Sequence, residues 1–148
     1  MRLSTVQELK AEIEQEQSRL ESLRASSTII ITRLDGLPRP TSQSSRVEGL
    51  AVAVIDSERR IAELVDEYAA ASIQLLDEIY SRIKNKAARA VLFKRYVLCK
   101  QFAEIATELG YSEANVYRLH RRGKNLFERT DSDDKNHGGR RRDTGGSS

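Results

Sequence analysis

The chain has 148 residues and a formal net charge of +3, and 39% of its residues are hydrophobic, 32% charged and only 5% aromatic. This length suffices for one small domain joined to an extended helical part, and the composition favours long solvated helices over a bulky globular core. No apolar run approaches the roughly 18 residues that a membrane-spanning helix needs, which excludes a membrane span.

The first 34 residues predict an amphipathic helix. Apolar side chains recur in two registers of seven-residue spacing, which are Val6, Ile13 and Leu20, and Leu9, Leu23 and Ile30, with the polar Glu16 between them. Ser4 followed by Gln7 resembles a capping box at the start of this helix. The β-branched run 28–32 is either a short extended piece or the end of the helix. Because the stripe covers only about three heptads, the helix needs a partner, either within the chain or in another copy.

Residues 35–46 predict a linker, and a second, longer helix follows it. An Asp-Gly pair at 35–36 and the prolines Pro38 and Pro40 forbid a continuous helix. Ser45 and Glu48 form a capping box, so the long helix is expected from about residue 47 to residue 83. Its apolar stripe consists of Leu50, Val54, Ile61, Leu64, Val65, Tyr68, Leu75, Ile79 and Ile83.

Two arrangements of these helices remain open. The first helix can fold back on the long helix as an antiparallel hairpin, or the long helix can pair in parallel with another copy to form a homodimer. In either arrangement, residues 1–83 form a coiled-coil or assembly region, and their acidic side chains form the solvated face of a helix.

The charges are distributed unevenly along the chain. Residues 1–81 carry 9 basic and 14 acidic side chains, residues 82–130 carry 12 basic and 4 acidic ones, and residues 131–148 carry 4 of each. The middle segment therefore has a net charge of +8. Clustered cations release condensed counterions when they meet phosphate, so this segment is expected to contact nucleic acid.

Residues 84–130 predict a helix-turn-helix domain. A polar interruption at residues 84–86 ends the stripe of the long helix, and a first small helix is expected to pack through Ala88, Val91, Leu92 and Tyr96. In the motif itself, Gly110 can take the positive φ that a sharp turn needs, and Ala106 is small where the second helix crosses. Ser112 is a suitable N-cap for that second helix. Apolar contacts between the two helices are expected from Ile105, Leu109, Val116 and Leu119.

Helical periodicity sorts the residues of the second helix. Val116, Leu119, Gly123 and Leu126 are predicted to face the protein, whereas Ala114, Tyr117, Arg118 and Arg121 face outward, flanked by Glu113, Asn115 and Arg122. Arg118 and Asn115 are the expected base contacts, because Arg can bond guanine and Asn adenine at two points. The residues placed for phosphate contacts are Lys100, Gln101, Ser112, Arg121, Arg122 and Lys124. His120 borders the buried face and is interpreted as a packing or phosphate-adjacent residue.

The ends of the chain and its cysteine content bound the cellular setting. The tail 131–148 is polar, rich in glycine and aperiodic, so we expect it to be disordered. The acidic, amphipathic N-terminus is not a signal peptide, and the single Cys99 excludes an intramolecular disulfide. We therefore expect a cytoplasmic protein of a bacterial host cell, associated with the nucleoid and with no membrane.

Several short sequence segments of the C-terminal part match a known pattern. They are LFKRYV at 92–97, FAEIA at 102–106, GYS at 110–112 and VYRLH at 116–120. Residues 87–127 thereby resemble region four of bacterial sigma factors. They are even more similar to the C-terminal part of small phage and prophage proteins with a sigma-region-four-like end, whose N-terminal part is a pair of long helices around a variable linker. The resemblance implies an all-α fold, with a long-helix hairpin or coiled coil followed by a small C-terminal helix-turn-helix domain. It also implies base contacts by Glu113, Ala114, Tyr117 and Arg118.

The leading functional expectation is a phage-derived, sequence-specific transcription regulator that reads double-stranded DNA with the helix 112–127 and touches RNA polymerase. One alternative is a DNA-packaging component similar to a small terminase subunit. Another is an interaction protein whose coiled coil binds RNA polymerase or a sigma factor. The sequence has no glycine-rich phosphate loop, no metal-ligand spacing and no nucleophile with a positioned base, so we expect no enzyme activity, no cofactor and no metal site.

Overall fold

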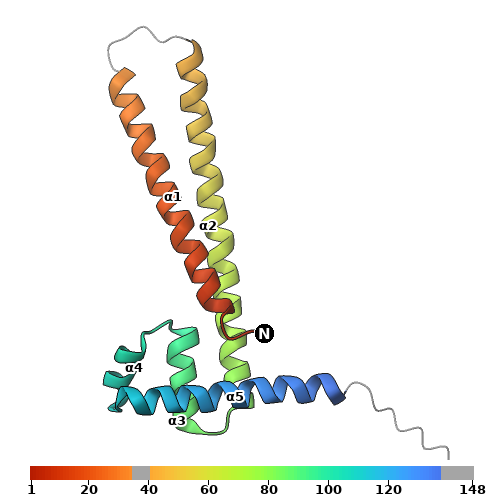
Figure 1. Cartoon of the computed structure of the whole chain (residues 1–148). Helices are drawn as coiled ribbons and strands as arrows, with labels where there is room; N and C mark the ends of the chain where they lie inside the picture. Colours follow the sequence, from red (N-terminus) through yellow and green to blue (C-terminus); the bar gives the residue numbers. More distant parts are fainter. Residues whose placement is uncertain (35–40, 138–148) are drawn as a thin grey trace, which may run out of the picture. The chain divides into compact units, whose positions relative to one another are not determined.

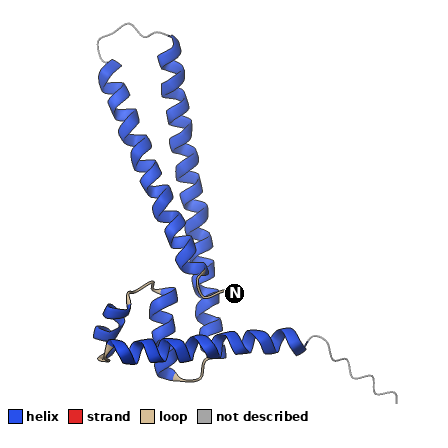
Figure 2. Cartoon of the chain, in the orientation of Figure 1, coloured by secondary structure: helices blue, strands red, loops and turns tan. Residues whose placement is uncertain are grey.

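The computed structural model describes the backbone of residues 1–34 and 41–137 and the side chains of residues 1–29 and 45–129. Within these ranges every regular element is a helix (Figure 1, Figure 2), so the predicted all-α class is confirmed. The elements are α1 (Thr5–Leu34), α2 (Thr41–Arg82), α3 (Lys86–Leu92), the π-helical turn η1 (Phe93–Val97), α4 (Phe102–Leu109) and α5 (Glu113–His137). The chain divides into two compact units, Met1–Ile73 and Gln74–Ser148, and the division lies inside α2.

In the N-terminal unit, α1 lies antiparallel to α2 (Figure 1). Among the described residues, polar contacts join Glu12 to Arg60 at 3.7 Å, Glu16 to Ser57 at 2.8 Å, and Arg24 to Glu58 at 2.6 Å. The Ser57 hydroxyl donates to the carboxylate of Glu16 and is only 4% exposed. A polar pair therefore occupies one layer of an otherwise apolar seam between α1 and α2.

The buried stripe of this unit follows a spacing of three and four residues. Its buried members are Leu3, Val6 and Leu20 before the linker, and Ser57, Leu64 and Ala71 on α2. The prediction for Val65 is wrong, because this side chain is 46% exposed. Steps of three and four lead from residue 57 to 61, 64, 68 and 71 and pass over 65. Ser57 was missed because a hydroxyl side chain carries no apolar signal.

The helix boundaries differ from the prediction at the linker. α1 continues as a helix through residues 28–32, so the extended alternative for this run does not apply. α2 begins at Thr41, which places Ser45 and Glu48 inside the helix, and the predicted capping box there is wrong. Serine and glutamine at 42–45 weaken a helix only slightly, and a proline is tolerated just before a helix start, so the helix extends back to residue 41. The predicted break at residues 35–40 lies outside the described residues.

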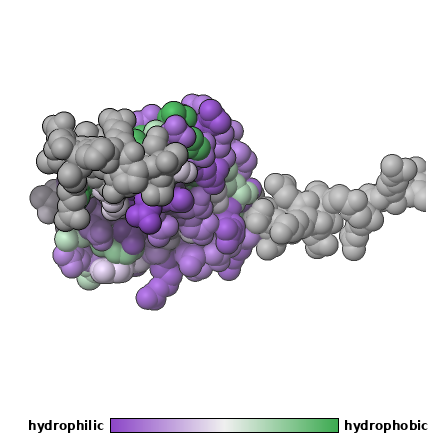
Figure 3. Space-filling model, turned by 90° about the horizontal axis from the view of Figure 1, so that it is seen from above, coloured by the Kyte–Doolittle hydropathy of each residue, from purple (hydrophilic) through white to green (hydrophobic). Residues whose placement is uncertain are grey.

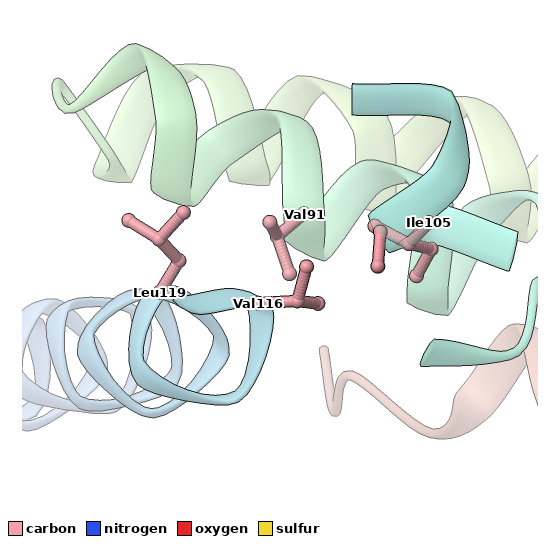
Figure 4. Close-up of a cluster of buried hydrophobic side chains, with 5 residues drawn as sticks. Val91, Ile105, Val116 and Leu119 are labelled. Atoms are coloured by element: carbon pink, nitrogen blue, oxygen red, sulfur yellow. The ribbon is translucent and has the colours of Figure 1, made fainter. Parts of the chain in front are cut away.

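In the C-terminal unit, α3 and α4 both pack against α5. α3 begins at Lys86 because the side chain of Asn85 accepts a hydrogen bond from the backbone N–H of Ala88 at 3.0 Å. The centre of the packing is a cluster of buried residues (Figure 4), which are Val91, Ile105, Ala106, Val116 and Leu119. Three of them, Ile105, Val116 and Leu119, were predicted to hold these helices together. Ala106 was predicted to be the small residue at the crossing, and Val91 was predicted to pack the first small helix.

α3 and α5 approach each other closely at Gly123. A Cβ atom at this position would lie 2.9 Å from Cγ of Leu92 and 3.3 Å from the carbonyl oxygen of Ala88. Such distances are shorter than ordinary van der Waals contact, so only glycine fits this crossing without a shift of its neighbours.

The predicted first small helix is divided into α3 and the π-helical turn η1. The N–H of Leu98 donates to the carbonyl of Phe93 at 3.1 Å, five residues earlier. Cys99 follows with a φ of 56°, a left-handed conformation that a side-chain-bearing residue adopts at a cost of about 1–2 kcal/mol. The widened turn and Cys99 together redirect the chain towards α4.

The last helix is longer than predicted. The backbone of α5 remains helical through His137, whereas disorder was expected from Asp131 onward. Residues 131–137 are polar but contain neither proline nor glycine, and the first glycine pair of this region stands at 138–139. The remaining tail, 138–148, lies outside the described residues.

Candidate nucleic-acid interface

A tight turn joins α4 to α5. α4 ends at Leu109, and Gly110 adopts a left-handed conformation with φ 68° and ψ 30°. The N–H of Tyr111 then donates to the carbonyl of Ala106 at 3.0 Å, which closes the end of α4. The predicted left-handed role of Gly110 is confirmed.

The start of α5 is capped by Ser112. Its hydroxyl accepts a hydrogen bond from the backbone N–H of Asn115 at 3.2 Å, so the predicted N-cap is confirmed. Glu113 and Ala114 form the exposed first turn of the helix. The negative charge of Glu113 lies at the positive end of the helix dipole, where it stabilises the helix.

One face of α5 is buried and the opposite face is exposed. Val116, Leu119 and Phe127 are at most 5% exposed, whereas Leu126 is only partly buried. Phe127 was missed as a buried residue, although it follows Gly123 by one helical turn. The exposed residues of the opposite face are Ala114, Tyr117, Arg118, Arg121 and Arg122, as the periodicity predicts.

The two residues expected to contact bases bind each other. Nε of Arg118 lies 3.3 Å and Nη2 2.8 Å from the amide oxygen of Asn115. Asn115 is partly buried, and Arg118 is exposed. The contact holds the guanidinium along one side of α5, and the Nη1 group of Arg118 and the amide NH₂ of Asn115 stay available as donors.

Three further cations of α5 differ in how much of their charge is compensated. Arg121 and Arg122 are exposed and form no hydrogen bond or ion pair with any described residue. Lys124 lies 4.0 Å from the carboxylate of Glu128, and both side chains are about half exposed. An exposed pair at this distance is weak, so Lys124 keeps most of its ability to bind an anion.

Lys100, which precedes α4 and was predicted to contact phosphate, forms an ion pair with Glu108. The carboxylate of Glu108 accepts hydrogen bonds from Lys100 and from Lys94, the latter at 2.6 Å. These bonds, with that from Lys100 the largest cause, lower the pKa of Glu108 below its usual value. Lys100 therefore contributes less positive charge than the sequence suggests. The neighbouring Gln101 N–H donates to Glu104 at 2.9 Å and is likewise occupied.

An aromatic cluster beside α5 was missed as a unit by the sequence analysis. The ring of Tyr117 lies 4.5 Å from that of Phe102, and the ring of His120 lies 5.1 Å from it at 82°. The Tyr96 hydroxyl and Nε2 of His120 are 2.7 Å apart, and the guanidinium of Arg95 covers the Phe102 ring at 4.6 Å. Tyr117 is thus anchored at its inner edge although it is 49% exposed. The i, i+3 spacing of Tyr117 and His120 was the available sequence signal.

The environment of His120 disfavours its protonated form. Partial burial lowers its pKa below the usual 6.5, and the positive charges of Lys124 and Arg95 lower it further. Burial also raises the pKa of Tyr96. His120 therefore lies in the helix packing, as interpreted from its position, with one ring nitrogen on the Tyr96 hydroxyl.

Comparison of the chain with known protein families, curated proteins and solved structures finds no match. In the described ranges, no three His, Cys, Asp or Glu side chains gather as a metal site would require. None of the described helices is both long enough and apolar enough to traverse a bilayer. The geometry and charge of α4 and α5 are therefore the features that indicate a function.

Proposed function

We propose that this chain is a DNA-binding transcription regulator, similar to region four of sigma factors, in which α4 and α5 form a helix-turn-helix and α5 enters the major groove of duplex DNA. The observation that carries the proposal is the pair Arg121 and Arg122. Both side chains are exposed on the outward face of α5, whose opposite face is buried, and no described residue neutralises their charge. Uncompensated cations on a rigid helix are the elements that bind phosphates flanking the major groove.

The contacts within the unit support different roles for the site residues in this proposal. Arg118 and Asn115 act together on base edges, and the exposed first turn of Glu113 and Ala114 approaches the same groove. Tyr117, held by Phe102, borders the groove with a ring of fixed orientation. The residues that bind phosphate are Gln101, Ser112, Arg121, Arg122 and Lys124, joined by Lys100 when it leaves Glu108.

The proposed setting is the nucleoid of a bacterial host cell, with RNA polymerase as a further partner. The side-chain contacts between α1 and α2 support a scaffold role for the N-terminal unit. The alternatives are a DNA-packaging component and a coiled-coil protein that binds polymerase or a sigma factor. They differ in that the first needs a ring assembly and the second needs no DNA affinity.

The test is selection of a random duplex library on the purified chain, followed by titration of the enriched sequence. We expect one enriched motif, and we expect the double variant R121A/R122A to lose at least about tenfold in affinity for it. The matched control is R19A/R46A, which removes the same charge from exposed positions of the N-terminal unit. An equal loss in both variants, or retention of DNA without any enriched motif, would contradict sequence-specific reading by α5.

A further inference from the structure

A second stripe with heptad spacing runs along α2, on the face opposite the buried one. Its members are Val52, Ile55, Arg59, Ala62, Asp66, Ala69 and Ile73, separated alternately by three and four residues. All of them are exposed. At 100° per residue, this stripe lies roughly half a turn away from the buried residues Ser57 and Leu64.

The apolar members of the stripe are unusually open to solvent. Val52 is 57%, Ile55 is 53% and Ile73 is 70% exposed. Most of the coloured residues seen in Figure 3 are hydrophilic, and the hydrophobic ones form small separate areas. Single exposed apolar residues are ordinary, but β-branched residues in line at heptad spacing are typical of a seam between helices.

The centre of the stripe holds one charge of each sign. Arg59 and Asp66 are exposed, and neither forms a hydrogen bond or ion pair with any described residue. Seven helical residues separate them by about 10 Å along the axis, which is too far for them to pair with each other. Each of these charges therefore has an open position for a partner of the opposite sign.

We propose that this stripe binds a second copy of the chain, with α2 antiparallel to the α2 of the other copy. Reversal of the stripe brings Arg59 of one copy beside Asp66 of the other, and the twofold axis creates this pair twice. It also brings the apolar end with Val52 and Ile55 against Ile73 of the other copy.

The order of residues in the stripe selects the antiparallel direction. A parallel pairing would set Arg59 against Arg59 and Asp66 against Asp66, and like charges in contact are unfavourable. The small side chains of Ala62 and Ala69 flank the charges, and they leave room for the two long helices to approach. This inference does not depend on DNA binding.

The test is a charge exchange on the full chain, with association measured by sedimentation equilibrium. We expect the wild-type chain to form dimers. R59D places Asp against Asp66 and D66R places Arg against Arg59, so each variant should raise the dissociation constant by at least about tenfold. The double variant R59D/D66R restores both pairs and should dimerise like the wild type. The control D56R changes an exposed charge outside the stripe and should leave dimerisation unchanged.

A mixing experiment separates the two directions of pairing. In an antiparallel dimer of one wild-type chain and one R59D/D66R chain, Arg would meet Arg and Asp would meet Asp. The two proteins should therefore form separate dimers when they are mixed. Mixed dimers that form in preference to either homodimer would indicate parallel pairing and overturn the proposal. A monomeric wild-type chain, single variants that dimerise normally, or a double variant that fails to recover while its circular dichroism is unchanged would each overturn it as well.

Discussion

Arg118 and Asn115 form a two-point contact in which a single amide oxygen accepts from two nitrogens of one guanidinium, at 2.8 and 3.3 Å. The contact lies within one turn at the start of α5, which is the part of the helix that meets base edges in the proposed DNA complex. It orients the Arg118 guanidinium before any ligand arrives. Less rotamer freedom is then lost on binding, which favours affinity and selectivity together.

Removal of Arg118 tests its role in reading bases. We expect R118A to weaken binding to the selected sequence by about 1–3 kcal/mol more than binding to unrelated duplex DNA. Fluorescence anisotropy at fixed salt measures both affinities. The control is R129A, which removes the same charge from an exposed position farther along α5. Equal losses on the two DNAs in R118A would show that Arg118 contacts only phosphate.

Release of Glu108 from its two lysines should strengthen DNA binding. In E108Q the side chains of Lys94 and Lys100 lose their shared carboxylate, so two cations become available to phosphate. We expect higher affinity for any duplex and a log–log salt dependence that is steeper by about one to two. The control E67Q makes the same charge change at an exposed residue of α2. An unchanged salt slope would place both lysines away from the DNA.

A methyl group at Gly123 should destabilise the C-terminal unit. The added Cβ would lie 2.9 Å from Cγ and 3.0 Å from Cδ1 of Leu92, so the Leu92 side chain or the helices themselves must shift. We expect G123A to lower the free energy of unfolding by about 1–3 kcal/mol in urea titrations. G49A is the control, since a Cβ at Gly49 meets nothing within 4 Å in a helix, and it should stabilise by about 0.5–1 kcal/mol. Similar effects of the two substitutions would contradict the close crossing.

Two substitutions at Gly110 should differ in how much they lower the free energy of unfolding. Its φ of 68° is unfavourable for alanine, so we expect G110A to lower the free energy of unfolding by about 1 kcal/mol. Asparagine tolerates the left-handed region better, so G110N should cost less. Thermal unfolding of the two variants makes the comparison. If the order were reversed, the strain would not lie in the backbone of the turn.

The lowered pKa of His120 predicts a loss of stability in mild acid. The folded state resists protonation of this ring, whereas the unfolded state takes the proton near the usual 6.5. The stability is therefore fully present above this value and decreases as the pH falls below it towards the folded pKa. We expect H120Q to show a smaller decrease in the free energy of unfolding between about pH 7.5 and about pH 5.5. Equal decreases in both proteins would assign the effect to another group.

Features determined by local sequence were predictable, and features determined by packing were not. Gly110 and Ser112 have their roles because turn geometry and capping depend on neighbouring backbone atoms, which the sequence displays directly. Val65 was misassigned because an apolar residue at the edge of a stripe looks the same whether it faces a partner or solvent.

The exposed face of α5 could be predicted from the sequence, but the side chains that pair with the site residues could not. Periodicity alone placed Arg118 and Arg121 outward. The partners of Lys100 and the ring beneath Tyr117 could not be foreseen, since Glu108 and Phe102 reach them only through the fold. The π-helical turn η1 likewise carries no sequence pattern that separates it from an ordinary helix end.

The bond between Glu16 and Ser57 makes the pairing of α1 with α2 selective for one alignment. If α1 slid by one heptad along α2, the Glu16 carboxylate would face Leu50 or Leu64 and lose its hydroxyl donor, whereas the apolar layers would still match. The partly exposed carboxylate would then lose a hydrogen bond to a charged group, which contributes about 1.5–3 kcal/mol. The bond therefore favours one register between α1 and α2 over the registers displaced by one heptad.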